Sequence, residues 1–380
     1  MARHAPERAL ARVDLGAVER NCAQLQSLLG GRARLCAVVK ADGYGHGANW
    51  VAKAALAGGA DWLAVATADE AAELRHHGVD SRILVMGALT PEDARTAIEA
   101  VADVVVWREG FVPVLAERLP DGAAPARVHV KLDTGMGRLG ATTVDEALAV
   151  ADLVAAEPRL ELAGAMTHFA TADEDGDDFF GAQLERFNEF AATARSRHPG
   201  ILVHAANSAA TFRDPAAHFD MVRCGIAVYG LDPFQGDPAE RGLEPALSLT
   251  SYVARVQRFE PGETAGYGRR WTAESPTLVA TLPIGYGDGW RRNLSNNCEV
   301  LIRGRRYPLV GTVSMDNITV ELGPDSDVEV GHEAVLIGRQ GGERIRAEEV
   351  AQRLGTINYE VTCGLTQRVK RHWHARDEDA

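Results

Sequence analysis

Eight short apolar runs alternate with helical patterns over the first 240 residues, and this alternation constrains the fold more than any other feature. The runs are RLCAVVK (34–40), WLAVA (62–66), RILVM (82–86), DVVVW (103–107), RVHVKL (127–132), LELAGAM (160–166), ILVHA (201–205) and FDMVR (219–223). They are apolar on both faces and rich in β-branched residues, which is typical of parallel strands covered by helices. The pattern predicts an α/β fold, either a closed (β/α)8 barrel or a doubly wound open sheet, and periodicity does not separate the two.

The segments between these runs carry signals for the beginnings of helices. Thr67 and Glu70 have the spacing of a capping box, and the helix that they begin should end at Gly78. The sequence TPED at 90–93 offers a capping threonine, a proline for the first helical position and two acids for the positive end of the helix dipole. Helices therefore separate the predicted strands.

After about residue 240 the apolar residues alternate with a period of two, which indicates a mainly β domain. The alternating runs are SLTSYVARVQRF (248–259), PTLVATLPI (276–284), CEVLIRG (298–304), NITVEL (317–322) and EAVLIG (333–338), with one short helix near 347–354. A segment rich in proline, glycine and charge, LDPFQGDPAERGLEP (231–245), has the composition of a linker. We therefore predict two domains, residues 1–240 and 241–380.

The charge balance and the cysteines exclude several classes of function. A net charge of −13 argues against nucleic acid or an anionic membrane surface as the partner. No apolar run approaches the ~18 residues of a membrane span, and the N-terminus lacks the apolar region of a signal peptide, so a cytoplasmic location is expected. Five cysteines without a CxxC pair, and scattered histidines, predict reduced, mostly buried thiols and no metal site.

Lysine is scarce in this chain, and two of its four lysines lie at the ends of predicted strands. The four are Lys40, Lys53, Lys131 and Lys370, among 40 basic residues. In α/β folds the chemistry gathers at the carboxyl ends of the strands. The polar residues found there are Lys40, Lys131 with Arg138, His168, Asn207-Ser208 and Arg223-Cys224-Gly225-Ile226. They predict one site at one end of the sheet.

The segment AVVKADGYGHG (37–47) points to a carbonyl cofactor. Its glycines suit a tight, mobile loop that approaches a ligand, and it is not a P-loop because the lysine precedes the glycines. A partly desolvated lysine at a strand end suits Schiff-base chemistry, for example with pyridoxal phosphate. Ser208, Gly225 and Ile226 could then donate to the phosphate, and Arg223 is the cation available to the pyridine nitrogen.

Several segments resemble the signature motifs of bacterial alanine racemases, in that family's order and over essentially the whole chain. They are AVVKADGYGHG, KLDTGMGRLG (131–140), MTHFA (166–170), ANSAA (206–210), VRCGIAVYG (222–230), AGYGRRW (265–271), IGYGDGW (284–290), GTVSMDN (311–317) and TINYEVTC (356–363). The resemblance implies an N-terminal (β/α)8 TIM barrel, a C-terminal mainly β domain, and pyridoxal phosphate as cofactor. It thereby favours the closed barrel over the open sheet.

The resemblance also implies a role for each matching residue. Lys40 matches the lysine that carries the cofactor and serves as base on the D face, and Tyr267 matches the base on the L face. The cofactor-binding positions are Lys40, Tyr44, His168, Ser208, Arg223, Gly225, Ile226 and Tyr359, with Arg223 facing the pyridine nitrogen and His168 bonded to Tyr267. Arg138 and Met315 match groups that hold the substrate carboxylate, Lys131 matches a lysine that is often carbamylated, and Tyr286, Asp316 and Tyr359 match residues near the entrance.

The expected protein is thus a homodimeric isomerase that interconverts L- and D-alanine by two bases and supplies D-alanine for peptidoglycan. In the family, Tyr267, Met315 and Asp316 reach into the partner's barrel. A racemase of another small amino acid, such as serine, is the alternative that the sequence excludes least. A barrel-type amino-acid decarboxylase is disfavoured by Arg223 and the Tyr267 segment, and a non-catalytic pyridoxal-phosphate carrier by the β domain.

Overall fold

The computed structural model describes residues 7–174, 176 and 178–375, and divides them into two compact units. Residues 1–6, on which the expected cytoplasmic location partly rests, lie outside the described range. One unit comprises residues 18–234 and 239–244, and the other comprises residues up to 17, 235–238 and from 245 onward. The chain thus changes unit within the predicted linker. Residues 7–17 group with the C-terminal unit rather than with the barrel.

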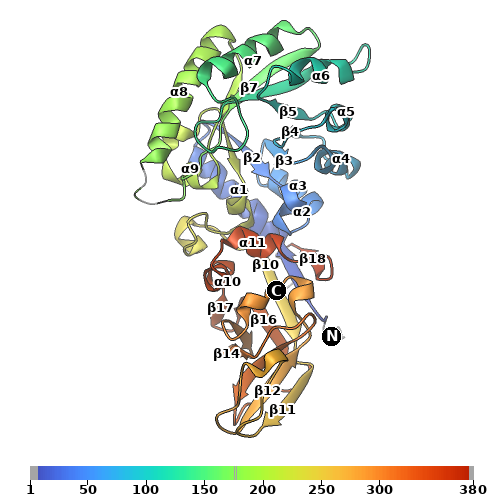
Figure 1. Cartoon of the computed structure of the whole chain (residues 1–380), viewed down its shortest axis with the longest axis vertical. Helices are drawn as coiled ribbons and strands as arrows, with labels where there is room; N and C mark the ends of the chain where they lie inside the picture. Colours follow the sequence, from blue (N-terminus) through green and yellow to red (C-terminus); the bar gives the residue numbers. More distant parts are fainter. Residues whose placement is uncertain (1–6, 175, 177, 376–380) are drawn as a thin grey trace. The chain divides into compact units, whose positions relative to one another are not determined.

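Within the first unit, eight described strands form a closed parallel barrel in the order β2 to β9 (Figure 1). They are β2 (Arg34–Val38), β3 (Trp62–Val65), β4 (Arg82–Val85), β5 (Asp103–Val106), β6 (Ala126–Lys131), β7 (Leu160–Met166), β8 (Leu202–His204) and β9 (Met221–Cys224). Each predicted run overlaps one of them, and β9 closes the barrel by pairing with β2. The closed barrel is confirmed and the open sheet is excluded.

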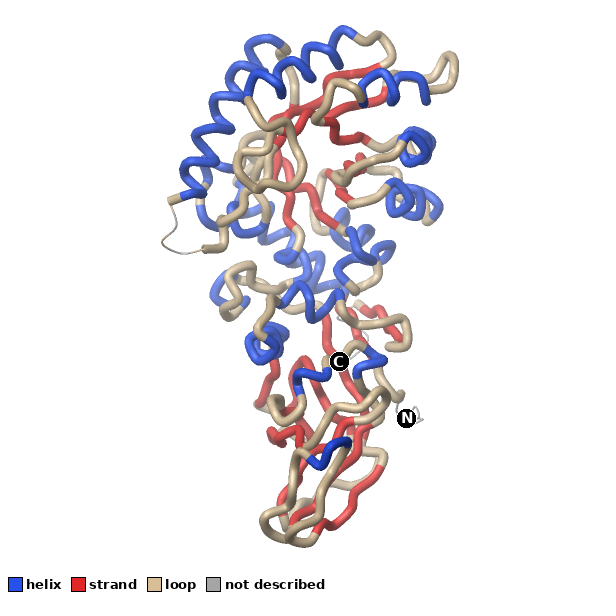
Figure 2. The backbone as a smooth tube through the Cα atoms, viewed as in Figure 1, coloured by secondary structure: helices blue, strands red, loops and turns tan. Residues whose placement is uncertain are grey.

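Helices surround the barrel strands, as Figure 2 shows. They are α1 (Leu15–Leu29), α3 (Ala48–Ala57), α4 (Ala68–His76), α5 (Pro91–Glu99), α6 (Phe111–Arg118), α7 (Val144–Ala156), α8 (Phe179–Arg197) and α9 (Ser208–Arg213), with the short turn α2 (Lys40–Tyr44) after β2. Their apolar faces are buried against the barrel: Phe187 and Phe190 of α8, for example, are fully buried. None of the described helices is long and apolar enough to cross a membrane.

Capping boxes fix the first turns of three of the described helices, α4, α5 and α7. The predicted box of Thr67 with Glu70 is confirmed, and the predicted capping threonine Thr90 forms a box with Asp93. The third joins Thr143 to Glu146, whose backbone N–H donates to the threonine hydroxyl over 3.1 Å. Each box satisfies backbone N–H groups that a helix terminus otherwise leaves without an acceptor.

In the C-terminal unit the described strands form a ten-stranded sheet. The strands are β1 (Leu10–Asp14), β10 (Leu247–Tyr252), β11 (Arg255–Phe259), β12 (Thr277–Leu282), β13 (Glu299–Ile302), β14 (Arg305–Val310), β15 (Ile318–Gly323), β16 (Glu333–Gln340), β17 (Glu343–Ile345) and β18 (Lys370–His374). Their order is β11-β12-β15-β14-β13-β16-β10-β1-β18, with β17 on β16. The helices α10 (Ala347–Leu354) and α11 (Asn358–Cys363) follow β17, and α10 has the predicted bounds.

The sheet differs from the prediction in several respects, and the strands β17 and β18 lie outside the predicted runs. The run 248–259 is two strands with different neighbours, since β10 pairs with β1 and β16 whereas β11 pairs with β12. The strand β14 was not expected because Pro308 interrupts its apolar pattern. The first strand β1 joins this sheet between β10 and β18, so residues 10–14 belong to the C-terminal unit although they lie at the start of the chain.

We expect Thr143→Ala to lower the free energy of unfolding by about 1 kcal/mol, because the first turn of α7 loses its hydroxyl acceptor. Thr143→Ser keeps the acceptor and should restore most of the stability. Guanidinium denaturation of the purified protein measures both variants. Equal stability of Thr143→Ala and the wild type would show that this box contributes nothing.

Candidate active site

The predicted residues of the barrel unit lie at the carboxyl ends of its strands. Lys40 comes two residues after β2, Lys131 is the last residue of β6, and His168 comes two residues after β7. Arg223 lies within β9, one residue before its end, and Ser208 begins α9 four residues after β8. Because all eight strands are parallel, these positions share one rim of the barrel.

The backbone that follows Lys40 makes a left-handed turn. Ala41, Asp42 and Tyr44 have φ values of 52°, 51° and 53°, and Gly43 lies between them at 59°. For residues other than glycine this conformation costs roughly 1–2 kcal/mol each. Several consecutive positive φ values place strain beside the predicted reactive lysine, which is where strained backbone tends to occur.

Hydrogen bonds from neighbouring elements hold this turn in place. The N–H of Ala41 donates to Oε1 of Glu70 over 2.7 Å, and the N–H of Ala48 donates to Oδ1 of Asp42 over 2.9 Å. His46 Nδ1 lies 3.0 Å from the carbonyl oxygen of Tyr44, which requires a proton on that nitrogen. The segment is tight, as its glycines predicted, and its backbone is tied to α4 through Glu70.

Polar donors converge between β9 and α9. The N–H of Gly225 donates to Oγ of Ser208 over 3.0 Å, and the N–H of Ala227 lies 3.4 Å from the same oxygen. A Cβ atom at Gly225 would lie 2.3 Å from the hydroxyl oxygen of Tyr44, so only glycine leaves room for that hydroxyl. Ile226 follows at the beginning of a 3-10 turn (Ile226–Tyr229). A hydroxyl, a phenol and backbone N–H groups thus face one place.

Arg223 is 3% exposed and donates several hydrogen bonds. Its Nη1 lies 2.8 Å from Nδ1 of His204, and its Nη2 donates to the carbonyl oxygens of Thr167 over 2.8 Å and Ala205 over 3.0 Å. Nη2 also lies 3.4 Å from Nδ1 of His168. Burial lowers the pKa of Arg223 to about 10, so the group remains a cation at neutral pH.

This cation and its neighbours change the ionisation of the rim. Burial and the charges of Arg223, Arg138 and Lys40 lower the pKa of Lys131 to about 8, against a smaller opposing effect of Asp133. Burial and the same cations hold the pKa of His168 well below its ordinary value. At neutral pH His168 is therefore uncharged, and part of the Lys131 population is a neutral amine.

The Asp133 carboxylate organises the loop that carries Arg138. It does so by accepting backbone hydrogen bonds. The Asp133 carboxylate accepts hydrogen bonds from the backbone N–H groups of Gly135 over 2.8 Å and Arg138 over 2.9 Å. Burial alone would raise the pKa of Asp133, but these backbone N–H groups lower it. The Arg138 side chain itself is exposed. The loop therefore presents a long, exposed cationic side chain on a backbone that hydrogen bonds hold in place.

In the C-terminal unit three glycine-rich motifs lie together. The N–H of Tyr286 donates to the carbonyl oxygen of Ser314 over 3.0 Å, and the N–H of Gly287 to that of Met315 over 2.9 Å. The Thr312 hydroxyl donates to the carbonyl oxygen of Tyr267 over 2.7 Å. A Cβ atom at residue 285 would lie 2.2 Å from the Ser314 oxygen, so glycine permits this approach. The AGYGR, IGYGDGW and GTVSMDN motifs thus form one surface.

Large side chains project from this surface. Tyr267 is 73% exposed, Met315 is 50% exposed and Tyr286 is 42% exposed. Asp316 accepts a hydrogen bond from Nη2 of Arg368 over 2.6 Å. Tyr359 lies half-buried in α11 of the same unit. The structure therefore assembles Tyr267, Tyr286, Met315 and Asp316 on one unit, and the barrel residues on the other.

Sequence reasoning missed Asp103 and His129, two buried residues that are connected to Arg223 through His204. His204 Nε2 lies 2.8 Å from His129 Nδ1, and His129 Nε2 lies 3.2 Å from Oδ2 of Asp103. All three side chains are fully buried. Each is a polar residue inside an apolar strand, in DVVVW, RVHVKL and ILVHA, and that irregularity was a readable signal.

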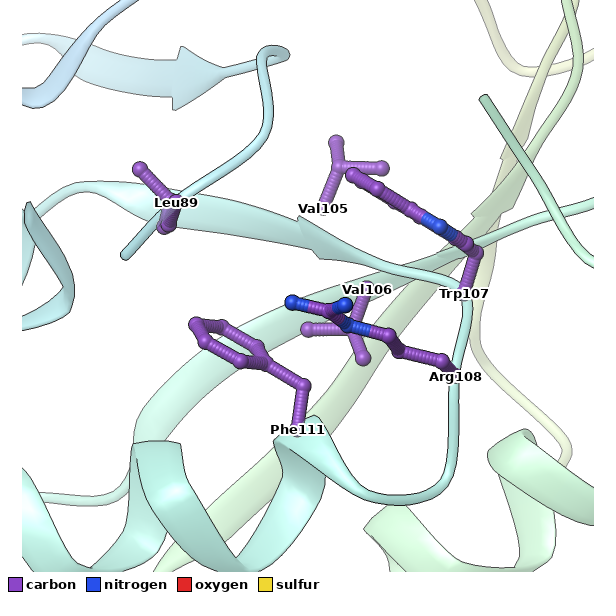
Figure 3. Close-up of a pocket in the computed structure, with 6 residues that line it drawn as sticks. All are labelled: Leu89, Val105, Val106, Trp107, Arg108 and Phe111. Carbon is purple, nitrogen blue, oxygen red and sulfur yellow. The ribbon is translucent and has the colours of Figure 1, made fainter. Parts of the chain in front are cut away.

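The cysteines and a small cavity lie apart from this chemistry. The described cysteines form no disulfide, and four of the five are buried, as expected. Burial raises the pKa of the Cys224 thiol to about 12, which excludes it as a nucleophile at neutral pH. Figure 3 shows a pocket at the end of β5 that is lined by Trp107, Arg108 and Phe111 among others, with the Arg108 guanidinium near the Phe111 ring. Its volume is about 10 Å³. It contains none of the predicted site residues.

The barrel residues fit pyridoxal phosphate. A phosphate group needs several donors in one place, which the Ser208, Gly225 and Tyr44 cluster supplies; the missing side chain at residue 225 lets the Tyr44 hydroxyl join this cluster. A pyridine nitrogen needs a polar partner, and Arg223 is a buried, permanent donor. A carbonyl carbon needs an amine, which Lys40 supplies at the same rim.

Comparison with known proteins supports one family throughout. Residues 13–233 match the model of the alanine racemase N-terminal domain, and residues 246–373 match that of the alanine racemase C-terminal domain. The chain is 44% identical to an alanine racemase of Symbiobacterium thermophilum, covering 96% of both chains. It is also 44% identical to an alanine racemase of Geobacillus stearothermophilus, covering 95% of this chain and 92% of that one.

Solved structures agree with the sequence comparison. The crystal structure of alanine racemase from D-cycloserine producing Streptomyces lavendulae superposes with a TM-score of 0.93 at 38% identity, covering 98% of each chain. The family models together match most of the chain, and the identity extends over both units. This chain belongs to the alanine racemase family.

Proposed function

We propose that this protein is an isomerase that interconverts L- and D-alanine, with pyridoxal phosphate bound covalently at Lys40 and with Lys40 and Tyr267 as its two bases. The family assignment and the 44% identity to alanine racemases support the reaction. The observation that carries the site is the buried Arg223 beside the Ser208, Gly225 and Tyr44 donors, at the barrel rim that also holds Lys40.

The cofactor, when bound, supplies electron withdrawal from the α-carbon, which makes the proton on that carbon removable. The chain supplies the positioning. With the cofactor bound, the phosphate would be held by Ser208, Tyr44, Tyr359 and the N–H groups of Gly225 and Ile226. Arg138 and Met315 hold the substrate carboxylate, and His168 orients Tyr267.

Arg223 determines how far the electron withdrawal extends. A carboxylate at the pyridine nitrogen would keep that nitrogen protonated, whereas arginine only donates and stays charged. With the cofactor bound, Arg223 would leave the nitrogen unprotonated and would limit the spread of negative charge into the ring. This limit disfavours transamination and decarboxylation, and favours the return of a proton to the α-carbon.

Two bases on opposite faces allow inversion without turning the substrate over. Lys40 moves the proton on the D face and Tyr267 moves it on the L face. The exposure of Tyr267 and Met315, 73% and 50%, supports a homodimer in which these side chains enter the partner's barrel. We further propose that the enzyme is cytoplasmic and supplies D-alanine for peptidoglycan.

Incubation of the purified protein with pyridoxal phosphate and L-alanine should give nearly equal amounts of the two enantiomers, measured by chiral chromatography. Lys40→Ala should lose both this conversion and the visible absorption of lysine-bound pyridoxal phosphate. A yellow protein that converts L-serine but not L-alanine would move the substrate and keep the cofactor. An unchanged spectrum of Lys40→Ala would place the covalent bond elsewhere.

Tyr267→Phe should separate the two faces. It should reduce racemisation by about 10²–10⁴-fold, since a positioned acid or base contributes on that order. In D2O the variant should still exchange the α-proton of D-alanine, through Lys40, but not that of L-alanine. Proton NMR measures both exchanges. Tyr252→Phe, in β10 outside the motifs, is the matched control, and equal exchange of both enantiomers by Tyr267→Phe would remove Tyr267 from the mechanism.

We also propose that Lys131 is carbamylated. Its neutral amine nitrogen attacks carbon dioxide and loses one proton, so that a negative charge replaces a positive one beside Arg138. The lowered pKa of about 8 supports this, because the neutral amine becomes the major form at a pH near 8 rather than near 10.

At a fixed carbon dioxide concentration, carbamylation of Lys131 should increase as the pH rises from 7 to 9, because the neutral amine is the reactive form. Carbon-13 NMR with ¹³C-labelled carbon dioxide should show one protected carbamate signal, absent in Lys131→Met. Lys53, which is exposed, provides the comparison through Lys53→Met, which should keep the signal. No carbamate signal at any pH would refute the modification.

A further inference from the structure

A chain of buried side chains crosses the barrel interior from the amino-terminal end of β5 to Arg223. Asp103 is the first residue of β5, His129 the fourth of β6, and His204 the last of β8. The links are Asp103 Oδ2 to His129 Nε2 at 3.2 Å, His129 Nδ1 to His204 Nε2 at 2.8 Å, and His204 Nδ1 to Arg223 Nη1 at 2.8 Å. Both ring nitrogens of each histidine are thus engaged.

The ends of the chain determine where every proton lies. Arg223 can only donate, so His204 Nδ1 is the acceptor and its proton is on Nε2. That proton is donated to Nδ1 of His129, which therefore carries its own proton on Nε2 and donates it to Asp103. Asp103 can only accept hydrogen bonds while it is ionised, and its lowered pKa keeps it ionised at neutral pH. Although burial would raise its pKa, hydrogen bonds from His129, Arg82 and Arg127 lower it.

Two arginines keep the acceptor end fixed. Nη2 of Arg82 donates to Oδ2 of Asp103 over 2.7 Å, and Nε of Arg127 donates to Oδ1 over 2.8 Å. Arg82 also lies over the ring of Trp62, 4.4 Å from its centroid, and Trp62 meets His129 edge-on. Arg82 and Arg127 therefore hold the carboxylate ionised and oriented. Their positive charges balance it at the amino-terminal end of β5, whereas Lys40 follows the carboxyl end of β2.

A glycine in β7 makes room for the central link. The strand β7 lies between β6 and β8, so the bond from His129 to His204 has to pass β7. A Cβ atom at Gly164 would lie 2.3 Å from His129 Nδ1, the atom that accepts from His204. The same Cβ atom would lie 2.6 Å from the carbonyl oxygen of Leu202, so an L side chain at this position would displace the histidine, the backbone of β8, or both. A β-strand by itself does not need a glycine here. The close approach of the histidine explains why this position lacks a side chain.

We propose that Asp103 and His129 are positioning residues for the cofactor site: they fix His204 as a neutral Nε2–H tautomer whose Nδ1 accepts from Arg223, and so hold Arg223 as an oriented donor. The effect on the cofactor rests on the proposed function, whereas the tautomers do not. The arrangement parallels other sites in which a carboxylate fixes the tautomer of a histidine that acts on a reacting group.

Nitrogen-15 NMR of the histidine-labelled holoenzyme tests the chain at neutral pH. Both His129 and His204 should show a protonated Nε2 and an unprotonated Nδ1, each with a slowly exchanging proton. A charged imidazolium or an Nδ1–H tautomer at either residue would overturn the proposal. This measurement requires no turnover, so it can fail or succeed independently of the racemase assignment.

Variants connect the chain to the cofactor. Gly164→Ala and His129→Phe should each remove the single-tautomer signal of His204 and weaken pyridoxal phosphate binding by about tenfold, a loss typical when an outer hydrogen-bonding partner is removed. Asp103→Asn, the smallest change, should do the same if larger substitutions prevent folding. Cofactor titration followed by absorption measures the binding.

Asp232→Asn is the matched control. Asp232 is a buried carboxylate that pairs with Arg241 and takes no part in the hydrogen bonds from Asp103 to Arg223. It should leave the His204 signals and cofactor affinity in place even if stability falls. Unchanged His204 signals in a folded Asp103→Asn or His129→Phe protein would contradict the positioning role. Altered signals with unchanged cofactor affinity would disconnect the chain from the cofactor, and would overturn that part of the proposal.

Discussion

A guanidinium buried inside a barrel is the constraint on which the rest of this site depends. Arg223 is 3% exposed, and an isolated charge in such surroundings is expensive unless its donors are satisfied. The barrel satisfies them with the backbone carbonyls of Thr167 and Ala205 and with His204, rather than with an adjacent carboxylate. The positive charge is therefore stabilised without being cancelled, and it contributes to the lowered pKa values of Lys131 and His168.

The strained backbone beside Lys40 is a second unfavourable feature, and local hydrogen bonds offset it. Residues 41–44 adopt left-handed conformations, which three of them disfavour as L-residues. The compensation comes from bonds that neighbouring elements donate or accept, above all Glu70, which both caps α4 and accepts from the N–H of Ala41. A helix cap and a reactive-lysine turn thus share one carboxylate, so the position of Lys40 is coupled to the beginning of α4.

Much of the architecture could be predicted from the sequence, because period and composition report burial. The eight apolar runs correspond to β2 to β9 since strands covered on both faces leave a continuous apolar signal. The membership of β1 in the C-terminal sheet could not be predicted, because its partners are distant in sequence: Leu10 pairs with Thr250 and with Lys370. Pro308 concealed β14 for a local reason. At the site, residues at the strand ends stood out, whereas Asp103 and His129 lie in otherwise apolar runs, where only their polar character marked them.

The placement of the carboxylate explains why a chain of two histidines serves better than a direct ion pair. A carboxylate against Arg223 would offset its charge at close range, and its influence on Lys131 would fall, because Coulomb energy depends inversely on distance and is strong where the dielectric is low. With two neutral imidazoles between them, Asp103 orients the hydrogen bonds toward Arg223 while its charge is matched by Arg82 and Arg127 at the other end. The two imidazoles thus pass the orientation of the hydrogen bonds from Asp103 to Arg223 without bringing the negative charge near it. Arg223 therefore keeps its full positive charge at the rim, where the chemistry requires it.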